Sequence, residues 1–463
     1  MAFLSNVMRI SIAFMALKLF KCNVRDDTRR QRRRRVAIFQ SINGAWRTNK
    51  SAAKSNAATS PSAVMNVEPA ASAPATAEGA GKRVIIEGWR FLPHSYAIVN
   101  GWQLLALMRR KIDLKVVDVP FYRPFWQAQT GLFEPSAEEA LRSIAVAQPG
   151  ECADVTLRVF FPFNFAQSRS RLTAVFATLE QQLIRKSAVA DLPEYEQLLR
   201  GPPPANVKAV TPSRWSAEGF YRAGFAREQV LVVPHGVDTG TFHPMPEIRK
   251  QVRGGIPVVD DEFVFLTVGG MSGNKGIDLL IRGFAEVCRK FPAARLVLKG
   301  MDHLYISKRL VTRVLQTLSA GDQQRVLQRM TYLGESLSHD AMATLYQVAD
   351  AYVSPYRAEG FNLPVLEAAA CGIPIICTGG GPTDDFVTDE FARRIDSRTR
   401  VVTVDGRPGS QLDPSLDHLI VLMISAIEDS AWRNQAAEAG PRHVRARYTW
   451  DCAVDTLVRK LLN

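Results

Sequence analysis

The sequence is poor in cysteine and histidine, and neither residue type is spaced for a metal site. Six cysteines are scattered along 463 residues, and no two of them form a C-x-x-C pair. This pattern argues against a disulfide framework and structural zinc, and it fits a reducing compartment. The seven histidines show no ligand spacing either. The acidic stretches Asp260–Glu262 and Asp384–Asp385 have no D-x-D arrangement, so we interpret each as a charged turn and expect no metal or other cofactor.

Long apolar runs are also missing. The segment Ile10–Leu17 is apolar but is bracketed by Arg9 and Lys18, which makes it too short to span a bilayer. Its apolar part is also minimal for a secretory signal. The expected location is therefore the cytoplasm, with a peripheral position on the inner membrane face left open.

Acidic residues are scarce only at the start of the chain. The formal net charge is +13, but residues 1–80 hold 13 Lys and Arg against 4 Asp and Glu, so they carry nine of those thirteen charges. The remaining sequence is close to neutral. Nothing in it predicts a basic face, and we expect no nucleic-acid partner.

Residues 1–80 are predicted to form a basic, disordered extension. Arg29–Arg35 is a basic run, and Ser51–Gly81 is rich in Ala, Ser and Pro. Four interpretations remain open: a membrane-surface anchor, a signal or transit peptide, a tail without a role, and a start codon placed too far upstream. If the basic run binds anything, an anionic membrane surface is the expected partner. We expect folding and catalysis not to need this segment.

From Lys82 onward, buried strands alternate with amphipathic helices. Strands are expected at KRVIIEGW, LKVVDV, DVTLRVFF, RLTAVF, ANVKAVT and QVLVVP, and after a polar stretch at FVFLTV, ARLVLKG, MTYLG, DAYVSP and IPIICT. This order predicts an α/β fold of two doubly wound, parallel-sheet (Rossmann-like) domains that face each other across a cleft. The expected bounds are 81–243 and 244–442, followed by a C-terminal helix within 443–463.

The segment SPYRAEGFNLPVLEAAACG, Ser354–Gly372, contains two glutamates eight residues apart, Glu359 and Glu367. Pro364 suits the first turn of a helix, and Gly372 is placed to end it. Glu359 should therefore lie in a loop after a strand, with Glu367 in the first turns of the next helix. The free N–H groups at the start of that helix attract anions and hydroxyl oxygens.

This segment resembles the E-x7-E motif of the retaining glycosyltransferases of family 4, or group 1, which have the GT-B fold. The resemblance extends over VTPSRWSAEGFYRAGF, QVLVVPHGVD, FLTVGGMSGNKGIDLLIRGFAEV and LGESLSHDAMATLYQVADAYVSPY, roughly residues 210 to 385. It is weaker from 84 to 180. It implies transfer of a hexose from a nucleotide diphosphate sugar to a glycan, a lipid or a polysaccharide precursor.

The resemblance also assigns roles to residues. It places Glu359 beside the donor hexose as a catalytic group, and the backbone of Gly360, Phe361, Asn362 and Leu363 on the sugar and phosphate. Glu367 would bind the ribose hydroxyls. Lys275, in the loop GGMSGNKG, would contact the diphosphate as a donor-binding and catalytic residue. The family usually has a second diphosphate contact, an arginine, five residues before this lysine; here that position is Gly270.

The acceptor side is less determined. Arg90, His94 and Ser95 follow the first strand and are placed to face the cleft, but each could equally satisfy buried backbone. We interpret His235 as a hinge residue. Two alternatives remain open: a non-catalytic subunit that binds nucleotide sugars or carbohydrate, which Gly270 favours, and a nucleotide-sugar epimerase of the same fold.

Overall fold

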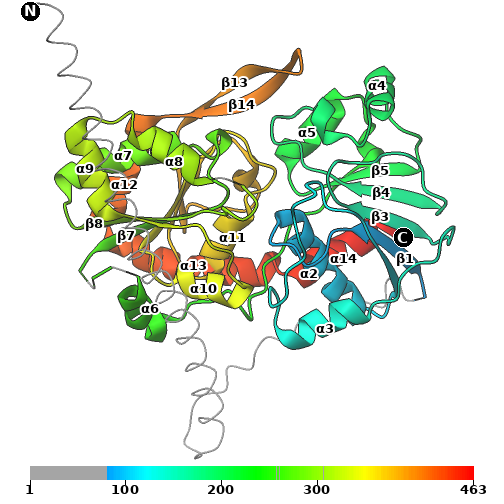
Figure 1. The fold of residues 1–463 in the computed structure, drawn as a ribbon, viewed down its shortest axis with the longest axis horizontal. Coiled ribbons are helices and arrows are strands. Elements are labelled where there is room, and N and C mark those ends of the chain that lie inside the picture. The colour runs from blue at the N-terminus through cyan, green and yellow to red at the C-terminus, as the bar shows by residue number, and fades with distance from the viewer. Residues whose placement is uncertain (1–80, 257, 260, 306, 463) are drawn as a thin grey trace, which may run out of the picture.

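The computed structural model describes residues 81–462 except 257, 260 and 306. The expectations for residues 1–80 therefore lie outside the described part. Figure 1 shows two α/β domains side by side, joined by chain segments that cross between them. The predicted fold class is confirmed: each domain contains a six-stranded sheet, and every strand pair in both sheets is parallel.

The first sheet has the order β2-β1-β3-β4-β5-β6. Its strands are β1 (Arg83–Gly88), β2 (Asp113–Asp118), β3 (Val155–Val159), β4 (Leu172–Phe176), β5 (Val207–Thr211) and β6 (Val230–Val232). The helices of this domain are α2 (Ser95–Arg109), α3 (Pro135–Ser143), α4 (Leu192–Arg200) and α5 (Arg214–Arg222), and the C-terminal helix α14 (Trp450–Leu461) packs on the same core.

The second sheet has the order β12-β11-β10-β7-β8-β9. Its strands are β7 (Phe263–Val268), β8 (Ala294–Lys299), β9 (Met330–Leu333), β10 (Ala351–Ser354), β11 (Ile375–Thr378) and β12 (Ala392–Ile395). The helices are α6 (Arg249–Gly255), α7 (Ile277–Lys290), α8 (Ser307–Leu315), α9 (Ala320–Arg329), α10 (His339–Tyr346), α11 (Leu363–Ala370), α12 (Leu416–Glu428) and α13 (Ser430–Arg447).

An antiparallel hairpin, β13 (Ser397–Val404) and β14 (Arg407–Pro414), extends from the second domain and was not predicted. Figure 1 shows it in orange, reaching toward the first domain. Hydrogen bonds attach it to the first domain. The Ser410 amide donates to the Gln181 carbonyl at 2.8 Å, and the Lys186 amide donates to Asp405 Oδ2 at 2.7 Å. The hairpin therefore ties the two domains together.

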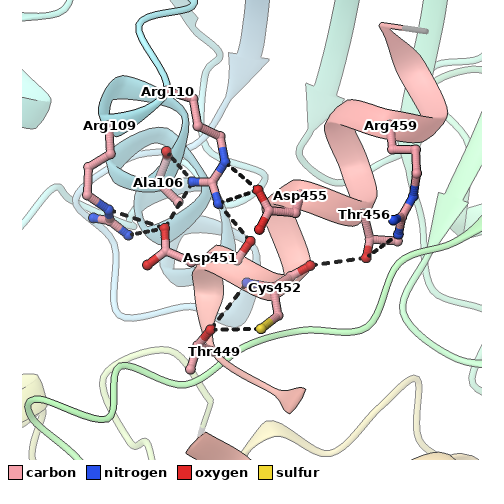
Figure 2. Close-up of polar contacts among 9 residues, drawn as sticks. All are labelled: Ala106, Arg109, Arg110, Thr449, Asp451, Cys452, Asp455, Thr456 and Arg459. Atoms are coloured by element: carbon pink, nitrogen blue, oxygen red, sulfur yellow. Dashed lines mark hydrogen bonds and ion pairs between the residues drawn. The ribbon is translucent and has the colours of Figure 1, made fainter. Parts of the chain in front are cut away.

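The chain crosses between the domains at two adjacent points. Val237 already packs in the second core, and it forms a parallel bridge with Thr449, where the chain returns to the first domain. Helix α14 is then fixed by ion pairs (Figure 2): the buried Arg110 guanidinium donates to Asp451 Oδ1 at 2.9 Å and to Asp455 Oδ1 at 2.8 Å. The last helix is thus part of the first domain's core.

Among the described helices, none combines the length and the apolar character needed to cross a bilayer. Within the same part of the chain, no group of three or more His, Cys, Asp or Glu side chains is arranged to hold a metal ion. Glu262, which belongs to one of the acidic turns, instead pairs with Arg295 and Arg329.

Candidate active site

Lys275 and Glu359 follow two neighbouring strands, and their side chains form an ion pair. Lys275 ends the short 3-10 helix η5 (Gly273–Lys275) after β7, and Glu359 follows β10, the adjacent strand. The Lys275 ammonium donates to Glu359 Oε1. Gly276 permits this approach, because its φ is +66° and a Cβ atom there would lie 1.8 Å from the Pro355 carbonyl oxygen.

The pair is buried on one side only. The Glu359 side chain is 6% exposed, whereas that of Lys275 is 25% exposed. Burial raises the pKa of Glu359, the Lys275 charge opposes that rise, and the Glu180 carboxylate adds to it. The ammonium can therefore reach both its partner and an anion in the cleft, while the carboxylate can accept hydrogen bonds from hydroxyl groups.

The loop from Gly360 to Leu363 touches the first domain. A Cβ atom at Gly360 would lie 2.7 Å from Thr178, and the Gly360 carbonyl accepts a hydrogen bond from Ser213 Oγ at 2.6 Å. Asn362 precedes α11 with a left-handed φ of +78°, and its side-chain amide donates to Ser354 Oγ at 2.9 Å. Both domains therefore hold this loop. It leads into the predicted helix, which is present as α11 with Pro364 in its first turn and Gly372 just beyond its end.

Glu367 lies on α11 and accepts a hydrogen bond from the Tyr346 hydroxyl at 2.7 Å. Burial raises its pKa to about 7, although the Tyr346 hydrogen bond lowers it. Glu367 borders a small recess, lined among others by Trp102, His339 and Trp450. Lys275 and Glu359 are not among the lining residues of that recess.

Gly270, at the position of the family's arginine, packs against Tyr305. A Cβ atom at Gly270 would lie 3.3 Å from the Tyr305 ring, which belongs to the loop after β8. A tyrosine ring, not a cation, therefore borders this part of the Gly269–Gly276 loop.

The three acceptor-side candidates have different surroundings. The Arg90 guanidinium donates twice to Asp118, at 2.7 and 2.6 Å, and once to the Leu141 carbonyl at 2.6 Å. These bonds occupy it inside the first domain. His94 caps α2, and its Nε2 lies 2.9 Å from the Tyr305 hydroxyl across the cleft. Ser95 is the exposed first residue of α2. Of the three, His94 is the one that the structure brings together with the second domain.

His235 is buried at the crossing point. Its ring contacts Phe176 of the first domain at 5.4 Å, Trp450 of α14 at 5.9 Å and Phe361 of the Gly360–Leu363 loop at 4.9 Å between centroids. Burial lowers its pKa to about 3, so the ring is neutral at physiological pH. That position is consistent with the hinge role expected from the sequence, which remains a prediction.

Sequence reasoning missed Glu180, a first-domain residue that forms a hydrogen bond with the second domain beside the ion pair. Asn274, one residue before Lys275, donates from Nδ2 to Glu180 Oε2 of the first domain at 3.0 Å. Glu180 follows β4, so the rule that ligands bind beyond the carboxyl ends of parallel strands could have identified it.

Residues 249–406 match the family model described as glycosyl transferases, group 1. The chain contains a glycosyltransferase group 1 domain. Lys275, Glu359 and Glu367 all lie within the matched stretch.

Curated relatives include D-inositol 3-phosphate glycosyltransferase 1 from Catenulispora acidiphila, which is 30% identical over 241 residues. The match covers 51% of this chain and 52% of the relative. The enzyme named D-inositol 3-phosphate glycosyltransferase from Mycobacterium tuberculosis is 28% identical over 231 residues, covering 50% and 43%. The chain thus spans about half the length of these relatives.

Solved structures support the GT-B fold over both domains. Sucrose-phosphate synthase from Thermosynechococcus elongatus superposes with a TM-score of 0.58 at 18% identity, covering 82% of this chain and 99% of that one. Anabaena HepE, solved in complex with UDP-glucose, superposes with the same TM-score of 0.58 at 15% identity and the same coverage. Identities this low establish the architecture alone.

Proposed function

We propose that this chain is a retaining glycosyltransferase of family 4 that transfers a hexose from a nucleotide diphosphate sugar to a hydroxyl group of a glycan or lipid-linked acceptor. The observation that carries the proposal is the Lys275–Glu359 pair beyond two adjacent strands of the group 1 domain, with Glu367 on the following helix. No metal or other cofactor is part of the proposal.

Each residue answers one demand of glycosyl transfer. The departing nucleotide diphosphate gains negative charge, which the Lys275 ammonium and the N–H groups at the start of α11 stabilise. The Glu359 carboxylate and the backbone after it hold the hexose hydroxyls, and Glu367 accepts hydrogen bonds from the ribose. The anomeric carbon loses its bond to the phosphate oxygen as it gains one to the acceptor oxygen on the same face. The acceptor proton passes to the departing phosphate.

The first test is a thermal-shift panel of UDP-, GDP- and ADP-sugars, beginning with UDP-glucose because a structural neighbour was solved with it. The best donor is then used for kinetics. Lys275→Ala should lower kcat by roughly 10²–10³-fold, the cost typical of losing one preorganised donor to a developing charge. Glu359→Gln should reduce turnover while nucleotide binding largely survives.

Matched controls are Lys290→Ala on α7 and Glu438→Gln on α13, both at exposed positions. Full activity of the Lys275 or Glu359 variant would overturn the site assignment. Proton NMR of the anomeric signal in early product tests the stereochemistry: a β-linked product from an α-linked donor would exclude the retaining mechanism.

A further inference from the structure

Three aromatic side chains from both domains meet at the mouth of the cleft. His94 and Trp126 come from the first domain, and Tyr305 comes from the second. The ring centroids lie 5.4 Å apart for His94 and Trp126, 6.2 Å for Trp126 and Tyr305, and 6.3 Å for His94 and Tyr305. We refer to these three residues as the aromatic triad. Trp126 is 6% exposed and Tyr305 is 44% exposed, so the triad has an open side.

The triad contains two hydrogen-bond donors that no protein acceptor in the described residues takes up, one on the exposed Tyr305 and one on the buried Trp126. The Tyr96 amide donates to His94 Nδ1 at 3.2 Å, and burial lowers the pKa of His94 to about 4, so the neutral ring carries its proton on Nε2. That proton is donated to the Tyr305 oxygen, which leaves the Tyr305 hydroxyl proton available. The Trp126 Nε1–H is buried and has no hydrogen-bond partner within the described part of the chain.

The Glu180 carboxylate lies close enough to Tyr305 to act on it electrostatically. Burial, and then the Glu180 carboxylate, raise the pKa of Tyr305 to about 12. Glu180 also raises the pKa of Glu359, and it accepts a hydrogen bond from Asn274, the residue before Lys275, so it lies near the proposed reaction centre as well. Two nearby cations are engaged elsewhere: Arg90 pairs with Asp118, and Lys275 pairs with Glu359 and, under the proposed function, binds the donor diphosphate. Arg123 lies at the rim, 4.7 Å above the Tyr122 ring, where its charge lowers the Tyr305 pKa.

We propose that the aromatic triad and Glu180 form the acceptor subsite and that it takes an uncharged ring bearing several hydroxyls, a saccharide or a cyclitol without phosphate. This inference rests on the proposed function and narrows its acceptor. A hydroxyl can donate to Glu180 and accept from Trp126 or Tyr305, while the apolar face of the ring packs on the aromatic side chains. A phosphate accepts only, and beside Glu180 it would meet a like charge.

The test compares binding of matched probes, so it does not depend on a donor. Methyl α-glucoside is paired with glucose 6-phosphate, and inositol is paired with inositol 3-phosphate, the compound named in the relatives above. Equilibrium binding to the full chain is measured by saturation-transfer NMR titration. We expect the uncharged compound of a pair to bind more tightly than its phosphorylated counterpart. Comparison of methyl α-glucoside with inositol then shows whether the subsite prefers a saccharide or a cyclitol.

Variants locate the binding. Trp126→Phe and Tyr305→Phe each remove one donor and should weaken the uncharged probe roughly fivefold, the usual cost of one hydrogen bond. Tyr221→Phe on α5, whose ring packs on Arg227, is the control and should change nothing. Glu180→Gln should reduce the preference for the uncharged member. Equal or tighter binding of the phosphorylated probe, no binding of any probe at its highest soluble concentration, or unchanged binding in both triad variants would overturn the inference.

The two proposals fail separately. If no nucleotide sugar shifts the melting temperature or is consumed, the glycosyltransferase function fails, whatever the probes do. If a donor binds and is consumed while phosphorylated probes bind best, the function stands and the acceptor assignment fails.

Discussion

Glu367 shows how burial can give a candidate binding residue a measurable pH signature. Its carboxyl has one hydrogen-bond partner, the Tyr346 hydroxyl, and a pKa raised to about 7 from an ordinary value of 4.5. Between those two values the folded protein holds a proton that the unfolded chain has lost. The contribution of Glu367 to stability is therefore present at acidic pH and is lost as the pH rises through about 7.

Glu367→Gln cannot ionise, so it should remove this dependence. The melting temperature of the wild type relative to the variant should fall between pH 5 and pH 8, as followed by differential scanning fluorimetry in a constant-ionic-strength buffer series. Glu438→Gln, at an exposed position on α13, should run parallel to the wild type. Parallel curves for Glu367→Gln would mean that the carboxyl titrates near its ordinary value.

At the same scale, the sequence could identify some site residues and not others. Lys275, Glu359 and Glu367 were recognisable because they stand within one continuous local pattern. Arg90 was named as an acceptor-side candidate, but the sequence could not show that it pairs with Asp118, which is 28 residues away at the end of β2. Trp126 and Tyr305 are still further apart in the chain, and they meet only where the two domains face each other. Local patterns cannot show which long-range contact a side chain makes.

At the scale of elements, the β13–β14 hairpin is the piece that sequence reasoning overlooked. Its turn carries Asp405 and Gly406 with φ values of +51° and +73°, the Asp-Gly signal of a tight hairpin. The signal was present, but β13 is largely exposed and lacks the apolar content by which the core strands were recognised. The core strands were predictable because strands buried on both faces read as continuous apolar runs.

A substitution of Arg407 tests whether this side chain holds the hairpin against the first domain. Its guanidinium donates to the Ile184 carbonyl and lies 5.4 Å from the Tyr195 ring centroid, both in the first domain. Arg407→Ala should loosen this interdomain contact, so the Lys186 and Ser410 amides should exchange faster with deuterium in mass spectrometry. Arg400→Ala, exposed on β13 of the same hairpin, is the matched control and should exchange like the wild type. Equal protection in both variants would show that Arg407 does not hold the hairpin.

At the scale of the whole molecule, the first domain depends on a helix from the far end of the chain. Arg110 on the C-terminal end of α2 binds the Asp451 and Asp455 carboxylates as well as the Ala106 and Asp451 carbonyls (Figure 2). Because the Arg110 side chain is 3% exposed, these bonds are shielded from solvent on its side. The bonds to Asp451 and Asp455 join segments that lie 341 and 345 residues apart in the chain.

Arg110→Ala should therefore destabilise the first domain by roughly 2 kcal/mol, within the range for lost hydrogen bonds to charged groups. Urea unfolding followed by tryptophan fluorescence should show an earlier transition for that domain. Arg459→Ala removes an exposed arginine from the same helix, whose bond to Thr456 is 3.4 Å long, and should leave the curve unchanged. Identical midpoints for the two variants would show that the ion pairs around Arg110 contribute little.

The hairpin also has a kinetic consequence. Its hydrogen bonds to Gln181 and Lys186 join the two walls of the cleft, and Gln181 is the neighbour of Glu180. Under the proposed function, release of product by separation of the two walls requires these hydrogen bonds to break. If that separation limits turnover, strengthening the hairpin contact would slow the reaction without altering its chemistry.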